Sequence, residues 1–174
     1  MNDMKMYDME FTDPTMTTWT LLRQTWTAVN KVAETRLGKL RLTPEKAAVL
    51  WACKDYPGTL TPAEIARLMF REAQTIAGLL NRMEREGLVK RIPKRKGRPF
   101  TEIRLTEKGK GICDAGIEVY KHLIQGLTSD LSAKEREELH GSLRKLRQKM
   151  LDEEHIEPRH VPGYPQGKQI PIEW

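Results

Sequence analysis

Basic side chains are concentrated in one part of this 174-residue sequence. Six Lys or Arg residues lie within the nine positions of KRIPKRKGR, residues 90–98, and an alternating apolar and polar run follows them. Residues 61–110 hold thirteen Lys or Arg against six Asp or Glu, a net charge of +7, so the rest of the chain sums to −1. Such a local excess indicates a surface that binds nucleic-acid phosphates, because their neutralisation releases condensed counterions. The alternative is a surface hairpin whose charge only keeps the protein soluble.

Two helices and a hairpin are predicted to position this charge. The segment TPAE, residues 61–64, is a capping box with proline at the first helical position, and it predicts a short helix over 62–69. A longer helix over 72–86 follows, and Gly87 ends it. Apolar residues alternate on both sides of a turn-rich tip at 93–99, which predicts an antiparallel hairpin.

The longer of these helices has one apolar face, and its other sides carry small or polar residues. It is about 22 Å long, at a rise of about 1.5 Å per residue, and can therefore lie in a major groove. The residues on its other sides are Gln74, Thr75, Ala77, Gly78, Asn81, Arg82 and Arg85. Gln74 and Asn81 can each form two hydrogen bonds with an adenine, which favours a binding site rich in A·T pairs.

Four amphipathic helices are predicted to flank this arrangement. They cover residues 14–37, 44–55, 106–127 and 132–150. The last two carry apolar stripes that need a partner, and they could pack on the first helix within one chain. Together with the first helix, however, they exceed what the module of two helices and a hairpin, about 50 residues long, can cover. We therefore expect a two-fold homodimer.

Four segments, taken in order, resemble those of a known family. They are LTPEKAAVLWA at 42–52, LTPAEIARLM at 60–69, QTIAGLLNRMEREGLVKR at 74–91 and IRLTEKGKGI at 103–112. With one long helix before them and two after them, the sequence resembles the MarR-type winged-helix transcription regulators over residues 15–151. The resemblance implies a mainly α fold with a small antiparallel β-hairpin wing: a winged helix-turn-helix with N- and C-terminal dimerisation helices.

The resemblance also implies where the protein contacts double-stranded DNA. The residues at the family's recognition-helix positions are Gln74, Thr75, Ala77, Gly78, Asn81 and Arg82, and those at the wing are Lys94, Arg95, Lys96 and Arg98. Gly97 and Pro99 stand where members commonly carry an Asp-x-Arg pair, so the salt bridge usual in the wing is absent. The two recognition helices of a dimer would lie about 34 Å apart and read a pseudo-palindromic operator.

Members of the family bind small, often aromatic, ligands in a crevice between the dimerisation helices and the winged module. The residues expected to line such a pocket here are Trp19, Trp26 and Trp51. The alternative is that these are ordinary core tryptophans.

The sequence thus divides into five predicted segments. They are a flexible N-terminal lead over 1–13, a dimerisation helix over 14–42, a winged-helix DNA-binding module over 43–110, C-terminal dimerisation helices over 111–151 and a Pro-rich extended tail over 152–174. The tail is either disordered or docked on the partner subunit through Ile170, Ile172 and Trp174.

The function that these features predict is a dimeric, sequence-specific DNA-binding transcription regulator, acting as a repressor and released by a small aromatic ligand. The alternative is a winged-helix protein-interaction scaffold without specific DNA binding. An enzyme is not expected, since the sequence shows no catalytic residue set, phosphate-binding glycine loop, metal-ligand cluster or cofactor motif.

The remaining features of the sequence concern location and redox chemistry. No apolar run is long enough to span a bilayer and the first residues do not resemble a secretory signal, so we expect a cytoplasmic protein. Cys53 and Cys113 are far apart in the sequence and belong to no metal-binding motif, which indicates structural thiols. A redox sensor is the alternative, and it would need an exposed thiol with a lowered pKa.

Overall fold

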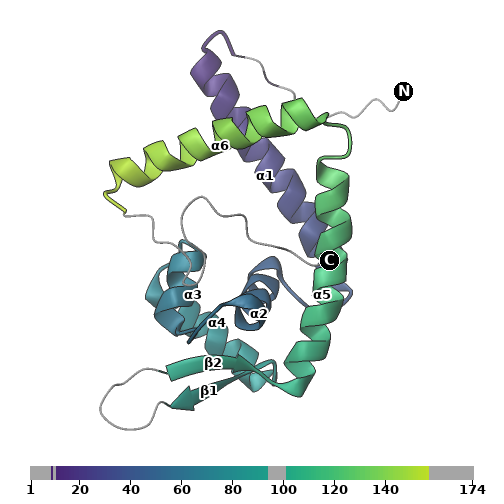
Figure 1. Cartoon of the computed structure of the whole chain (residues 1–174), viewed down its shortest axis with the longest axis vertical. Coiled ribbons are helices and arrows are strands. Elements are labelled where there is room, and N and C mark those ends of the chain that lie inside the picture. Colours follow the sequence, from purple (N-terminus) through teal and green to yellow (C-terminus); the bar gives the residue numbers. More distant parts are fainter. Residues whose placement is uncertain (1–8, 10, 94–100, 157–174) are drawn as a thin grey trace.

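The computed structural model describes residues 9, 11–93 and 101–156. The described elements are, in order, α1 (Pro14–Gly38), α2 (Pro44–Asp55), α3 (Pro62–Leu68), α4 (Ala73–Arg85), β1 (Val89–Pro93), β2 (Thr101–Leu105), α5 (Glu107–Leu127) and α6 (Ala133–Glu153) (Figure 1). The predicted mainly α fold with one antiparallel hairpin is confirmed. The tip of the hairpin, most of the N-terminal lead and the tail from residue 157 lie outside the described residues.

Side-chain caps start every described helix except α4. Asp13, Thr43 and Thr106 each accept a hydrogen bond from a first-turn amide, and at Ser132 the predicted capping box with Glu135 is complete. The capping box predicted before α3 is only half formed. The Thr61 hydroxyl accepts from the Glu64 amide, but the Glu64 carboxylate accepts from Tyr56 and Arg67 instead of reaching back to residue 61.

The hairpin is held on both sides by backbone contacts. Within it, Val89 lies opposite Leu105 and Arg91 opposite Ile103. On the outer edge of β2, the Ile103 amide donates to the Leu60 carbonyl at 2.9 Å, which ties the strand to the segment before α3. At the base, a Cβ on Gly109 would come within 1.9 Å of the Leu88 carbonyl oxygen, so only glycine allows α5 to approach the residue before β1 this closely.

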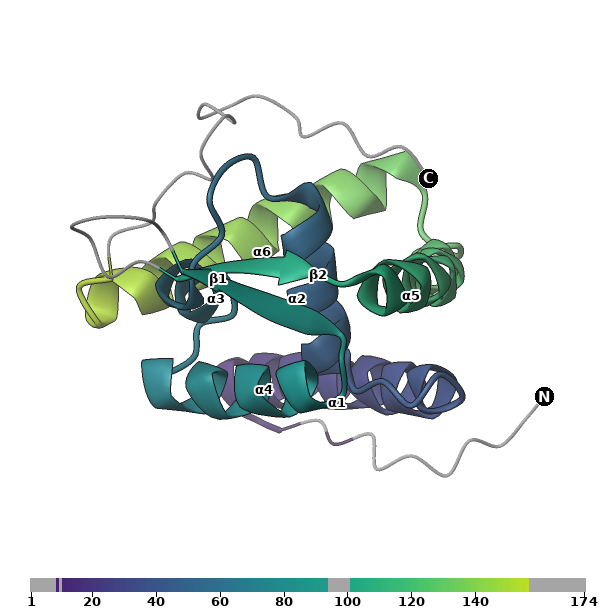
Figure 2. The same cartoon turned by 90° about the horizontal axis from the view of Figure 1, so that it is seen from below.

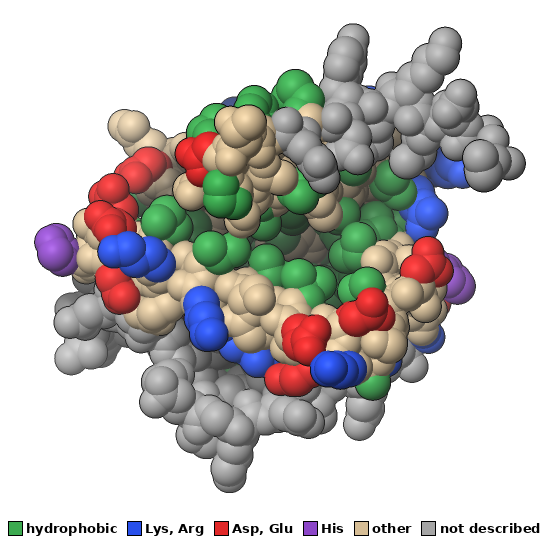
Figure 3. Space-filling model, turned by 90° about the horizontal axis from the view of Figure 1, so that it is seen from above, with side chains coloured by type: hydrophobic (Ala, Val, Ile, Leu, Met, Phe, Trp, Pro, Cys, Tyr) green, Lys and Arg blue, Asp and Glu red, His purple; other side chains and the backbone are tan. Residues whose placement is uncertain are grey.

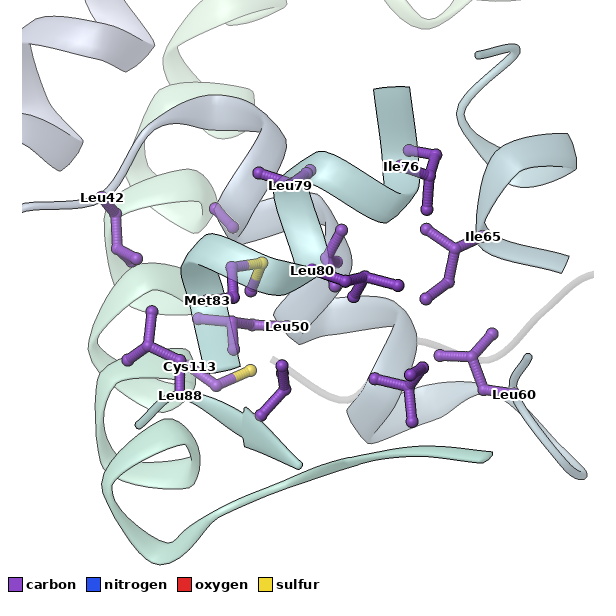
Figure 4. Close-up of a cluster of buried hydrophobic side chains, with 14 of the residues drawn as sticks. Leu42, Leu50, Leu60, Ile65, Ile76, Leu79, Leu80, Met83, Leu88 and Cys113 are labelled. Atoms are coloured by element: carbon purple, nitrogen blue, oxygen red, sulfur yellow. The ribbon is translucent and has the colours of Figure 1, made fainter. Parts of the chain in front are cut away.

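One hydrophobic core lies between α2, α3, α4, the hairpin and the first half of α5 (Figure 4). Leu50, Ile65, Ile76, Leu80 and Met83 are among its largest fully buried side chains, and each comes from the apolar face of its helix. This core fixes the rotation of α4 about its own axis, because the buried residues determine which residues remain outside.

The long helices α1 and α6 and the second half of α5 form a second part of the molecule, above the core in Figure 1. Leu151 is the only buried residue of α6. Large apolar side chains are exposed on these helices at Trp19, Trp26, Leu139, Leu143 and Met150. Figure 3 shows hydrophobic side chains gathered in a hollow on this side of the molecule, with charged residues around its rim.

Candidate nucleic-acid interface

Helix α4 presents a polar face to solvent opposite its buried face. Gln74, Thr75, Ala77, Asn81 and Arg82 are exposed, and Gly78 is half-buried. Every residue that the sequence predicted for the outer sides of this helix is therefore accessible to at least some degree. Figure 2 shows α4 along one edge of the molecule, beside the hairpin. This face of α4 carries no large apolar side chain, so a partner can approach the helix backbone closely.

The N-terminus of α4 is suited to an anionic partner. Its N-cap residue, Glu72, makes no side-chain capping hydrogen bond, unlike the cap residues of the other described helices. The first-turn amides therefore keep their donors available, and the positive end of the helix dipole lies at the same point. A phosphate oxygen is a suitable acceptor for such amides.

The basic residues of the module divide into paired and unpaired groups. Arg91 donates to Glu84 at 2.9 Å, and Arg104 pairs with Glu102 at 2.9 Å, so both guanidinium groups are already engaged. The Glu84 carboxylate also accepts from the Arg91 amide, so this pair holds the hairpin against α4. Within the described residues, the basic side chains of the module without an ion pair to a carboxylate are Arg71, Arg82, Arg85, Lys90 and Lys108. These, with the wing, are the cations available for phosphates.

The wing residues predicted to contact DNA, Lys94, Arg95, Lys96 and Arg98, lie outside the described residues. The strands that carry them are described, and the register from Val89↔Leu105 to Pro93↔Thr101 places both strand ends beside the tip. The wing contacts stay a prediction.

The turn between α3 and α4 contains a residue that the sequence analysis did not select. Phe70 has a φ of 50° and is 63% exposed, although a bulky residue rarely adopts a left-handed backbone conformation. It precedes Arg71 at the entry to α4, so an aromatic ring and a cation stand side by side in sequence next to the polar face. In the sequence, this conformation could have been suspected from an aromatic residue in the turn between two helices, where glycine or asparagine is usual.

The three tryptophans predicted to line a ligand pocket differ in their surroundings. Trp51 packs against Tyr120 with ring centroids 6.2 Å apart and lines a small cavity between α2 and α5. That cavity has a volume of only about 10 Å³, about enough for one water molecule, and neither Trp19 nor Trp26 lines it. Trp19 and Trp26 are 57% and 67% exposed on α1. A pocket lined by all three tryptophans stays a prediction for the dimer.

The two cysteines have raised pKa values. Burial, with a smaller contribution from Cys113, raises the pKa of Cys53 to about 12, and burial raises that of Cys113 to about 11. The thiolate is the reactive form, so both groups are neutral thiols at physiological pH. This favours the structural interpretation over the redox sensor.

The described part of the chain contains no helix that is long and apolar enough to cross a membrane. A two-helix turn, a hairpin on its C-terminal side and a polar second helix together define a winged helix-turn-helix protein.

Comparisons with known proteins relate the winged module to a family. Residues 42–98 match the model of the MarR family. The structure resembles S. aureus MepR in a DNA complex, with 26% sequence identity and a TM-score of 0.73 over 80% of this chain and 99% of that one. It also resembles an E. coli MarR mutant complexed with operator DNA, with 22% identity and a TM-score of 0.70 over 79% and 99% of the two chains. The match to the MarR family model thus covers the winged module, residues 42–98.

A third structure is relevant to ligand binding. The organohalide-sensing regulator RdhR in its 2,4-dichlorophenol-bound form shares 22% identity with this chain, with a TM-score of 0.76 over 95% of this chain and 98% of that one. A comparison with curated protein sequences finds no match.

Proposed function

We propose that the protein is a dimeric, DNA-binding transcription regulator that represses its target genes and does not act as an enzyme. The observation that carries this proposal is the exposed polar face of α4, which the core holds outward next to cations that have no carboxylate partner among the described residues. The MarR-family match over this same module and the likeness to regulators seen in DNA complexes support it. A DNA ligand also agrees with the expected cytoplasmic location.

The exposed residues of α4 divide into two kinds of contact. Gln74 and Asn81 carry amides that can pair with a base edge, and Thr75 can contact a thymine methyl group or a phosphate. Gly78 and Ala77 leave room for close approach. Arg82 and Arg85, near the C-terminal end of α4, would neutralise backbone phosphates and fix the register of the helix in the groove. Lys94, Arg95, Lys96 and Arg98 would add contacts from the wing.

The dimer is supported by the apolar side chains that one chain leaves exposed. Leu139, Leu143, Leu146 and Met150 recur every three or four residues along α6, and they are 40%, 42%, 41% and 61% exposed. They form one stripe of a helix that buries almost nothing in its own chain. A second copy related by a two-fold axis covers both stripes at once and places two α4 helices for a pseudo-palindromic operator.

A small aromatic effector is proposed for the region around Trp19 and Trp26, which one chain leaves exposed. The dichlorophenol-bound regulator of similar fold supports this choice of ligand class. Such a ligand would release DNA only if it binds better to one separation of the two α4 helices than to the other.

Salt titration of DNA binding tests the proposed function. For a dimer that contacts about six to ten phosphates, affinity should fall about a thousandfold or more between 50 and 200 mM salt. The protein should also prefer an operator from its own upstream region over an unrelated duplex of equal length. Binding that is absent, or that does not respond to salt, would favour the alternative of a protein-interaction scaffold.

A further inference from the structure

Two carboxylates stand at the C-terminal end of α4, among the arginines that are proposed to contact phosphates. Glu84 lies in the last turn and Glu86 is the C-cap residue, and they alternate with Arg82 and Arg85. The Glu86 amide donates to the Arg82 carbonyl at 3.0 Å, so the helical turn between these two residues is intact. Side chains four positions apart are neighbours on a helix surface. The Glu86 carboxylate is therefore a potential competitor of DNA for the Arg82 guanidinium group.

The side chain of Arg82 extends away from this carboxylate. Its Nη1 atom lies 4.0 Å from the point where a Cβ on Gly78 would stand, one turn nearer the N-terminus. Long side chains in helices favour this direction. In the described part of the chain, Arg82 forms no ion pair and no side-chain hydrogen bond. The guanidinium group thus lies along the polar face of α4, beside the small residue that leaves room for a groove.

The Glu86 carboxylate is held instead by Lys46, in the first turn of α2. The Lys46 ammonium group donates to both carboxylate oxygens of Glu86, each at 2.7 Å. The Lys46 side chain is only 13% exposed, so its aliphatic part is packed against the module while its charged end reaches Glu86. Since the buried residues Val49 and Leu50 fix α2 in the core, they also fix the origin of this lysine.

The other acceptors at this end of α4 are also bound by residues from outside the helix. Arg91 of β1 donates to the Glu84 carboxylate through its guanidinium group at 2.9 Å and through its amide at 3.2 Å. Lys108 of α5 donates to the Glu86 carbonyl at 2.7 Å, which places a cation at the negative end of the helix dipole. The hairpin, α2 and α5 thus supply the partners of these groups, and the arginines of α4 do not.

We propose that Lys46 is a positioning residue for DNA binding, which neutralises Glu86 and so keeps the Arg82 guanidinium group available for a phosphate. This inference rests on the proposed function of α4 as the helix that contacts DNA. Without Lys46, the Glu86 carboxylate takes Arg82 as its partner, because opposite charges four residues apart attract each other on a helix. A phosphate must then displace this carboxylate and approach its negative charge. Lys46 acts through Arg82 and does not itself need to contact DNA.

The first test is Lys46→Met, which keeps an aliphatic side chain in the packed position and removes the charge. Binding to an operator should weaken about two- to fivefold, because the attraction between Arg82 and Glu86 must be overcome in both subunits of a dimer. The slope of log affinity against log salt should decrease as it does in Arg82→Ala, but by less. The preference among bases should not change, since phosphate contacts carry no sequence information directly. Fluorescence anisotropy with a labelled operator measures all three quantities.

The two members of the ion pair should behave differently when each is replaced. Glu86→Gln also breaks the pair, but it leaves no carboxylate to bind Arg82, so DNA affinity should equal or exceed that of the wild type. The double variant Lys46→Met/Glu86→Gln should return to within about twofold of the wild type. If the pair only held α4 in place, all three variants would lose affinity alike, and this result would overturn the proposal. A loss of affinity in Glu86→Gln decides against it even if Lys46→Met does not fold.

Two further variants separate this role from a general effect of charge. Lys54→Met removes the same charge from the last turn of α2, and it should leave DNA affinity and its salt dependence unchanged. In an Arg82→Ala background, Lys46→Met should cause no further loss, because the group through which it acts is gone. A weakening by Lys54→Met equal to that by Lys46→Met, or additive losses in the Arg82→Ala background, would overturn the proposal.

A measurement on the full-length protein without DNA distinguishes this inference from the proposed function. The Nε–Hε signal of Arg82 in two-dimensional NMR should shift in Lys46→Met and return to its wild-type position in Lys46→Met/Glu86→Gln. An unshifted signal in a protein that binds DNA would overturn only the role of Lys46. A wild-type protein that binds no DNA would refute the proposed function, and with it any role of Lys46 in DNA binding, whether or not the signal shifts.

Discussion

The winged module and the frame, formed by the long helices α1, α5 and α6, bury their apolar residues in different ways. In the module, Leu50, Ile65, Ile76 and Leu80 are exposed by 1% or less. In α6, which belongs to the frame, the apolar stripe is at least 40% exposed and only Leu151 is buried. The core of the module is therefore closed within one chain, whereas the stripe of α6 is left uncovered, as the proposed dimer requires.

The largest expected effect lies in the module core. Leu80→Ala should lower the free energy of unfolding by about 3–5 kcal/mol, because Leu80 is only 1% exposed and its truncation leaves a cavity. Urea denaturation followed by circular dichroism measures this change. The matched control is Leu68→Ala in α3, where the side chain is 40% exposed, and its effect should stay below about 1 kcal/mol. Similar losses of unfolding free energy in the two variants would contradict the expectation that stability depends on the buried core of the module.

The next largest effect is expected on dimerisation, through the exposed stripe of α6. Leu143→Glu should weaken dimerisation by about 2–3 kcal/mol, since it places a charge in the stripe of α6 that the partner is proposed to cover. Analytical ultracentrifugation over a concentration series measures the dissociation constant. Lys145→Glu, on the same helix but outside the stripe, is the control and should leave dimerisation unchanged. A monomeric wild-type protein at micromolar concentration would refute the dimer itself.

A smaller effect is expected on the polar face of α4. Gln74→Ala should cost about 1–2 kcal/mol of DNA affinity and relax the preference at one base position. Arg82→Ala should weaken binding to all sequences about equally and reduce the slope of log affinity against log salt by about one. Binding assays on an operator and on its single-base variants distinguish the two outcomes. A Gln74→Ala protein with unchanged sequence preference would remove Gln74 from the base-reading set.

The fold and the outer face of α4 could be predicted from the sequence because local signals are strong there. Thr61-Pro62 and Gly87 mark the ends of the two-helix segment, and the spacing of Ile76, Leu79 and Met83 fixes which side of α4 is buried. These signals depend on residues a few positions apart.

Other features depend on contacts between distant segments, and the sequence does not reveal them. The close approach of Gly109 to Leu88 and the Glu84–Arg91 pair arise only once the hairpin is folded onto α4 and α5. The competition of Tyr56 and Arg67 for Glu64 similarly prevented the reciprocal capping box that the local pattern predicted. The left-handed backbone conformation at Phe70 was not predicted, because no glycine stands at that position to indicate it. In the proposed dimer, the surroundings of Trp19 and Trp26 would depend on the second chain.

The smallest effect concerns the junction between the module and the frame, where Lys54 of α2 pairs with Asp114 of α5 at 2.8 Å. The hydrogen bond to Asp114 raises the pKa of Lys54, but the two side chains are 45% and 63% exposed, so solvent screens most of the attraction. Lys54→Met should therefore lower the free energy of unfolding by no more than about 0.5 kcal/mol, and 0.5 M salt should abolish the difference. Asp114→Asn is the companion variant, and the double variant should lose no more stability than either single one, as expected when both act through one pair. A loss of several kcal/mol on removing Lys54 would show that the junction, and not the apolar packing of α2 on α5, holds the module to the frame.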